Sequence, residues 1–150
     1  MVGLDVGSTT VKAIVVDPAT DKTFLFSRDG TNGTEPILLN GIPQPAPIAM
    51  TAGTRYRLRF INITPVDSDL TYSIVDASGN PMQWRAIAKD GWDFAADQTS
   101  PKAAREDNLS VGETRDYFLT PDKPGEFYLR AVAFQRMWIS VTLIVSPPQP

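Results

Sequence analysis

The stretch TRYRLRF, residues 54–60, alternates arginine with large apolar side chains. The apolar members are Tyr56, Leu58 and Phe60, and an arginine stands before each of them. Successive side chains of a β-strand point to opposite faces, so a period of two predicts a strand that is buried on one side only. The stretch therefore indicates a sheet with one face on a core and the other in water.

The same period recurs along the chain. Residues 127–131 and 139–145 alternate in this way, and 70–75, 83–88 and 114–119 are further strand candidates. The runs DASGNP (76–81) and PDKPG (121–125) each predict a hairpin loop between two strands. Residues 97–107 have room for one turn of helix at most. Many short strands separated by turns predict an all-β fold, a sandwich or a barrel.

The first 22 residues differ in style from the rest. Two β-branched segments, 3–6 and 11–16, are joined by Gly7-Ser8-Thr9-Thr10, which predicts a β-hairpin. A turn at 17–21 leads on to a third strand at 23–27. We expect one domain over residues 1–150, with the hairpin forming its first strands.

Composition excludes several classes of function. The chain has 150 residues, a net charge of −3, and neither histidine nor cysteine. Without imidazole and thiol groups, any chemistry would have to come from carboxylates, hydroxyls, lysine, arginine or tyrosine. We expect no metal, no cofactor and no catalysis. The basic residues are spread along the chain, which argues against nucleic acid as a partner. No apolar run approaches the roughly 20 residues of a membrane span, and no signal peptide is visible, so we expect a soluble protein, cytoplasmic as expressed.

Several short motifs at regular places in residues 23–147 share one family likeness. They are Leu38-Leu39-Asn40-Gly41, GTRYRLRFIN (53–62), Ala88-Lys89-Asp90-Gly91, LSVGET (109–114) and Asp116-Tyr117. In order and spacing they resemble the middle cupredoxin domain of laccase-like multicopper oxidases. The resemblance implies a Greek-key β-sandwich from a secreted or periplasmic family. That family holds copper in its first and last domains through histidine and cysteine, so this domain is expected to carry no copper.

The opening stretch GLDVGSTTVK, residues 3–12, has a different likeness. Over residues 1–21 it resembles the first phosphate motif of actin-like ATPases, most closely the activator ATPases of acyl-CoA dehydratases. The resemblance implies an aspartate that helps hold hydrated magnesium and a turn that cradles phosphate. The candidate phosphate-binding residues are Asp5, Gly7, Ser8, Thr9, Thr10 and Lys12. The later parts of such an ATPase have no counterpart in the sequence, so we favour a plain hairpin turn with polar tips.

Two unrelated likenesses in one short chain suggest a chimera. Our leading interpretation is a non-catalytic cupredoxin-like sandwich, engineered or recombined, with no selected activity. One alternative is a structural or interaction domain of a multicopper oxidase, and another is vestigial phosphate or nucleotide binding at residues 7–12. A grafted edge strand without evolved protection also offers a route to a homodimer.

Other candidate groups have simpler interpretations. The three arginines of 54–60 are either an anion or partner surface or, as we favour, the solvated face of a strand. We expect Trp84 and Trp138 in the core and Trp92 exposed, rather than a ligand platform. We interpret the acidic residues as solvated loops rather than a carboxylate pair or a calcium site; they are Asp90, Asp93, Asp97, Glu106 and Asp107. Asn32, Asn62 and Asn108 begin glycosylation acceptor patterns, which matter only in a eukaryotic secretory route.

Overall fold

The computed structural model describes residues 2–7, 10–15, 17, 19–106 and 108–148, with the side chains described from residue 17 onward. The strands are β1 (Val2–Gly7), β2 (Thr10–Val15), β3 (Asp21–Arg28), β4 (Ile37–Leu39), β5 (Ile48–Thr51), β6 (Tyr56–Asn62), β7 (Thr71–Asp76), β8 (Gln83–Lys89), β9 (Trp92–Asp93), β10 (Lys102–Ala103), β11 (Arg105–Glu106), β12 (Thr114–Leu119), β13 (Gly125–Ala133) and β14 (Arg136–Ser146). The described residues contain no helix.

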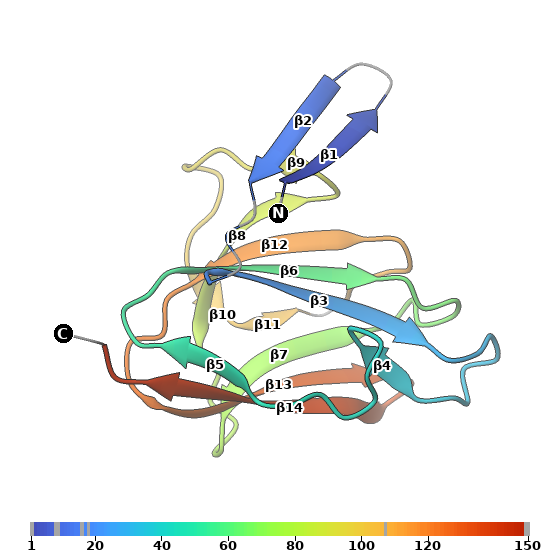
Figure 1. Cartoon of the computed structure of the whole chain (residues 1–150). Helices are drawn as coiled ribbons and strands as arrows, with labels where there is room; N and C mark the ends of the chain where they lie inside the picture. Colours follow the sequence, from blue (N-terminus) through green and yellow to red (C-terminus); the bar gives the residue numbers. More distant parts are fainter. Residues whose placement is uncertain (1, 8–9, 16, 18, 107, 149–150) are drawn as a thin grey trace.

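Two sheets face each other and form a β-sandwich (Figure 1). One has the strand order β10-β8-β12-β6-β3-β4, with β9 added beside β8, and the other has the order β11-β7-β13-β14-β5. The pairings β3–β6 and β5–β14 are parallel, whereas the other strand pairs are antiparallel. Parallel neighbours arise because the chain repeatedly crosses from one sheet to the other. The predicted all-β sandwich is confirmed.

Neither predicted hairpin loop joins two strands of one sheet. The loop 76–81 leads from β7 in one sheet to β8 in the other, and 121–125 leads from β12 to β13. The first loop nevertheless begins as a hairpin: Val75 forms an antiparallel bridge with Pro81, and Asp76 N–H donates to the carbonyl of Asn80 at 2.9 Å. The prediction therefore holds for this local reversal and fails for the strands that follow, because core packing decides which sheet each strand joins.

The segment 97–107, expected to form at most one turn of helix, has no helix among its described residues. It contains two short strands instead, β10 in one sheet and β11 in the other. Ala104 between them is fully buried; its N–H donates to the carbonyl of Met82 at 2.7 Å, and its carbonyl accepts from Ile74 N at 2.9 Å. The small side chain allows the chain to pass closely across the edge of the sandwich, which local sequence alone does not signal.

Strands β1 and β2 pair with each other as the predicted hairpin, from Val2 opposite Val15 to Gly7 opposite Thr10. They form a two-stranded sheet, and the first strand that pairs into the sandwich is β3. Figure 1 shows the hairpin beyond the layers, on the side of β8 and β9. The expectation that residues 1–22 supply the first strands of the sandwich therefore fails for the described pairings.

The core is organised around the aromatic side chain of Phe60. Its ring stacks on Tyr72 with centroids 4.2 Å apart and on Phe24 at 4.9 Å. Trp84 and Tyr117 meet it edge-on at 5.8 and 5.9 Å. These aromatic rings come from five strands of both sheets. Phe60, the last residue of the TRYRLRF stretch, therefore packs the two layers against each other.

Candidate functional site

The predicted phosphate site falls mostly outside what the structure describes. The backbone of Asp5, Gly7, Thr10 and Lys12 lies in the hairpin, where Asp5 pairs with Lys12. Ser8 and Thr9 lie outside the described residues, as do all side chains of residues 1–16. Phosphate binding at this turn stays a prediction.

The arginine face of β6 makes specific contacts with β12. Asp116, which is buried, accepts hydrogen bonds from Arg57 Nε at 2.9 Å and from Arg59 Nε at 2.8 Å. The guanidinium of Arg55 lies over the ring of Phe118, 4.7 Å from its centroid. The hydrogen bond to Asp116 raises the pKa of Arg59, against the opposing effect of burial. The face is therefore a structural ion cluster, closer to the solvated-strand interpretation than to a ligand site.

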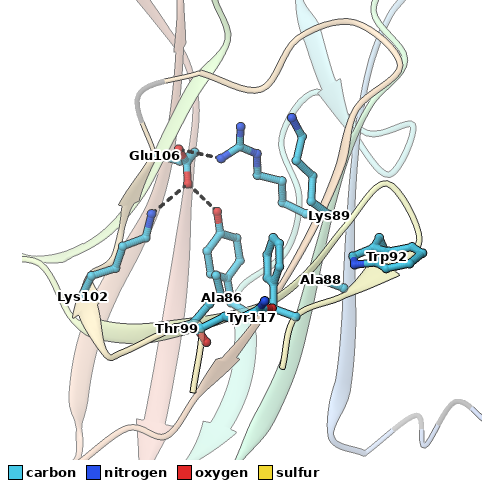
Figure 2. Close-up of a pocket in the computed structure, with 11 residues that line it drawn as sticks. Ala86, Ala88, Lys89, Trp92, Thr99, Lys102, Glu106 and Tyr117 are labelled. Carbon is cyan, nitrogen blue, oxygen red and sulfur yellow. Dashed lines mark hydrogen bonds and ion pairs between the residues drawn. The ribbon is translucent and has the colours of Figure 1, made fainter. Parts of the chain in front are cut away.

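The candidate site is a pocket over β8 and β12, with a volume of about 670 Å³. Figure 2 shows its lining, which comes from β8, β9, β12, the segment 94–99, and the short strands β10 and β11. Alanines occupy two β8 positions in the pocket, Ala86 and Ala88, and Tyr117 lines it from β12. Short side chains on β8 leave the space that larger residues would fill.

Glu106 is the polar centre of this pocket. Its Oε2 accepts a hydrogen bond from the Tyr117 hydroxyl at 2.5 Å and from Lys102 Nζ at 3.3 Å, while Oε1 lies 2.9 Å from Arg115 Nη1 (Figure 2). Burial alone would raise the pKa of the Glu106 carboxyl, but the hydrogen bond from Tyr117 and the charges of Arg115 and Lys102 outweigh it and lower the pKa. The carboxylate therefore stays ionised at neutral pH.

This finding corrects our interpretation of the acidic residues. Glu106 lies in strand β11 and is mostly buried, rather than in a solvated loop. Asp90 and Asp93 are on the surface beside β8, Asp97 is exposed, and Asp107 lies outside the described residues. The described part of the chain contains no group of three acidic, histidine or cysteine side chains suited to a metal ion.

A buried pair of phenols continues inward from Glu106. The hydroxyls of Tyr117 and Tyr72 lie 3.2 Å apart, and the Tyr117 ring stacks on Trp84 with centroids 4.0 Å apart. Burial is the largest cause that raises the pKa of both tyrosines well above the ordinary value. Both phenols are therefore neutral hydrogen-bonding groups that support Glu106 from the core.

The rim of the pocket is held in place by two further sets of contacts. Lys89 pairs with Glu113 at 2.7 Å and lies 3.9 Å from Asp90. Arg85 binds the segment 94–99 through Thr99 Oγ1 at 3.2 Å and through the carbonyl of Ala96. The pocket walls are thus tied back to β8 and to the loop before β12.

The tryptophans lie broadly as predicted. Trp84 is buried, and Trp92 is 74% exposed at the edge of the pocket, although it begins strand β9 instead of lying in a loop. Trp138 packs against the core only in part, between the guanidinium groups of Arg28 and Arg136. Sequence reasoning missed the pocket because its members come from six separate segments, and no local motif links them.

Of the three glycosylation patterns, the one at Asn62 has a structural role. The Asn62 side chain is fully buried and donates to the carbonyls of Asp67 at 2.8 Å and Leu109 at 2.7 Å. Its Oδ1 accepts from the backbone and hydroxyl of Thr64. Asn62 and Thr64 therefore connect two loops by hydrogen bonds and do not form an accessible glycosylation site.

No model of a known protein family matches the sequence, and no curated protein sequence matches it. Solved structures do match. A multicopper oxidase superposes with a TM-score of 0.66 at 19% identity, over 87% of this chain and 45% of that one. A multi-copper oxidase from Pseudomonas thermotolerans gives 0.57 at 20% identity, over 91% and 36%. The copper-containing nitrite reductase of Thermus scotoductus SA-01 gives 0.60 at 14% identity, over 87% and 31%.

These likenesses show the fold: the chain is a cupredoxin-like β-sandwich similar to domains of multicopper oxidases. This confirms the fold implied by the motifs of residues 23–147. The chain spans less than half the length of each of these proteins. Within the described residues there is no helix long and apolar enough to cross a membrane.

Proposed function

We propose that the chain is a copper-free, non-catalytic domain of a multicopper-oxidase-type protein, where it supports copper-bearing neighbours. The observation that carries this proposal is the partial match: the sandwich superposes on 28% to 45% of the length of multi-copper oxidases. The sequence has neither imidazole nor thiolate, whereas a type 1 copper site needs two imidazoles and a thiolate. The domain would thus contribute structure and leave the redox chemistry to its neighbours.

A set of exposed apolar side chains supports a neighbouring domain as the partner. The set, here called the end surface, lies on the loops and strand ends at one end of the sandwich and consists of Ile63, Val111, Phe134 and Met137. Each has between 45% and 55% of its surface exposed. The backbone of Asn62 bonds to Gly112 and Glu113, and Phe134 N donates to Asp69 at 2.9 Å, so these loops are joined to one another. Large exposed apolar groups gathered together are typical of interaction surfaces.

The proposal is tested on the native protein. An antibody to this domain should recover it either within a polypeptide about two to four times as long or in a stable complex of that size, and the recovered material should contain copper. The recombinant domain mixed with copper should lack the thiolate charge-transfer colour of a type 1 site. Recovery of the domain alone, without copper and without a partner, would contradict the proposal.

The end surface provides the matched variants for this experiment. Phe134→Asn keeps a residue that tolerates the left-handed backbone found at Phe134 (φ 50°). It should weaken association with the copper-bearing partner without lowering the melting temperature. Ile144→Ser, which removes an exposed apolar side chain near the C-terminal end of β14, should leave the association unchanged.

An engineered or recombined chimera is the second candidate. The pairing of β1 and β2 with each other, apart from the strands of the sandwich, favours it because an appended hairpin needs no partner strand in the host fold. Under this proposal the chain has no selected activity, and the antibody experiment above recovers the domain without a copper-bearing partner.

A further inference from the structure

The pocket over β8 and β12 combines an exposed aromatic ring with a rim of long polar side chains. Figure 2 shows Trp92 on one side of the pocket, with Lys102 and Glu106 on the other side and Tyr117 between them. Its volume, about 670 Å³, lies in the range of small-molecule sites. The inference below does not depend on the function proposed above.

The backbone at Trp92 follows a well-defined turn, and its indole is exposed. Asp90 and Gly91 form a two-residue turn with φ values of 49° and 77°, which places Trp92 opposite Lys89 in the β8–β9 ladder. Asp90 is tied to β12, since its N–H donates to the carbonyl of Thr114 at 2.9 Å and its carboxylate accepts from Thr114 N at 2.8 Å. A tight turn of this kind fixes the backbone position from which the ring projects. The indole offers an exposed flat surface at the edge of the pocket.

The cations that line the pocket are already engaged in ion pairs. They are Lys89, Lys102 and Arg115. Glu106, which also lines the pocket, pairs with Lys102 and Arg115, and Glu113 and Asp90, which lie outside the lining, pair with Lys89. An ionic ligand would have to break existing ion pairs, whereas a neutral ligand can add hydrogen bonds to the groups as they stand.

We propose that this pocket binds a neutral sugar ring. The C–H face of a pyranose is flat and weakly apolar and would stack on the Trp92 indole. Its hydroxyls both donate and accept, which suits a rim that offers ammonium donors at Lys102 and Lys89 and carboxylate acceptors at Glu106. Ala86 and Ala88 leave the floor open for the ring, and Tyr117 closes the pocket below.

Calorimetric titration of the complete chain with neutral oligosaccharides tests the proposal. The probes are cellotetraose, xylotetraose and chitotetraose, with benzoate as an anionic ring for comparison. We expect at least one neutral oligosaccharide to bind with a micromolar to millimolar dissociation constant that does not change with added salt. Trp92→Ala should weaken that binding about tenfold or more, and Trp92→Phe should weaken it less.

Phe134→Asn is the matched control, because it removes a different exposed aromatic side chain, and it should bind the sugar as the unchanged chain does. Circular dichroism checks that each variant is folded. Three results would overturn the proposal: no neutral probe binds at millimolar concentration, benzoate binds in their place with a salt-dependent affinity, or Trp92→Ala binds a sugar as tightly as the unchanged chain. Whether the antibody experiment recovers a copper-bearing partner does not affect any of these sugar-binding results.

Discussion

At the scale of single residues, the most constrained contact is the ion pair between Arg28 and Asp67. Arg28 Nε and Nη2 donate to the two carboxylate oxygens, both at 2.5 Å, and both side chains are 0% exposed. The guanidinium also lies over the ring of Trp138, 4.5 Å from its centroid. A buried pair of this kind is worth little against apolar residues of the same size, but removing one partner leaves an unpaired buried charge.

Asp67→Ala should therefore lower the free energy of unfolding by about 3–5 kcal/mol. The double variant Arg28→Met with Asp67→Leu should be destabilised less than the single variant, since no charge is left buried. Urea denaturation measures both, with Asp97→Ala, at an exposed acidic position, as the control. A single variant as stable as that control would show that the pair is not isolated from water.

Glu106 makes stability depend on pH. The pKa of its carboxyl is lower in the folded chain than the ordinary value of 4.5, because Tyr117, Arg115 and Lys102 together outweigh burial. A lowered folded pKa means that the stabilisation is complete above the unfolded pKa and is lost as the pH falls through the folded one. Glu106→Gln should lower stability at neutral pH and reduce the loss of stability on acidification.

Urea unfolding at several values between about pH 3 and pH 7 tests this expectation. Some acid dependence should remain, because the pKa of Glu113 is also lowered, mainly by its hydrogen bond with Lys89. Glu126→Gln, at an exposed position of β13, should keep the full acid dependence. An equal pH slope in the Glu106 and Glu126 variants would contradict the role given to Glu106.

At the scale of elements, the edge of β3 is protected by one side chain. Asn40 Oδ1 accepts from Leu25 N at 2.8 Å, and Asn40 Nδ2 donates to the carbonyl of Thr23 at 2.9 Å. Asn40 and Gly41 form a turn with φ values of 52° and 78°, so the asparagine serves both the turn and the neighbouring strand. The amide thus imitates a strand partner where β4 is too short to reach.

Asn40→Gly keeps the turn conformation and removes only the two side-chain hydrogen bonds. It should lower the free energy of unfolding by about 1–2 kcal/mol and promote self-association through the uncovered edge. Thermal melts and sedimentation at increasing concentration measure the two effects. Asn32→Gly, whose side chain bonds only within its own turn, should not self-associate, and identical behaviour of the two variants would refute the edge explanation.

At the scale of the whole molecule, the hairpin and the sandwich are joined by little described structure. Strands β1 and β2 pair with each other, while the core found among the described side chains, those from residue 17 onward, begins in β3. A two-stranded hairpin by itself contributes little stability in water. The turn that follows it is held separately, by Asp17 N and Asp21 Oδ2 at 2.6 Å and by Arg57 N and the carbonyl of Thr20 at 3.0 Å.

Removal of residues 2–15 should therefore leave a folded sandwich whose melting temperature lies within a few degrees of the complete chain. Differential scanning calorimetry measures the change. Removal of residues 2–26 is the matched comparison, because it also takes most of β3 and the buried rings of Phe24 and Phe26, and it should unfold the domain. If the shorter deletion also unfolds the domain, the hairpin is part of the cooperative unit.

The sequence by itself determined the strand content, most strand positions and the absence of copper ligands. These properties are local. The alternation in TRYRLRF places Tyr56, Leu58 and Phe60 in the core whichever sheet the strand joins. The absence of histidine and cysteine follows from the composition and does not depend on the fold. The motif resemblance also identified the sandwich. The same local reasoning placed Trp92 on the surface, because it follows a turn.

Only the tertiary structure decided which strands share a sheet, and therefore where β7, β8 and the hairpin belong. It also brought Glu106, Tyr117 and Trp92 around one pocket, and it paired Arg28 with Asp67 across 39 residues. Each of these depends on contacts between segments far apart in the chain. Such contacts are selected by the packing of a common core, and the period of a single strand carries no information about its distant partners.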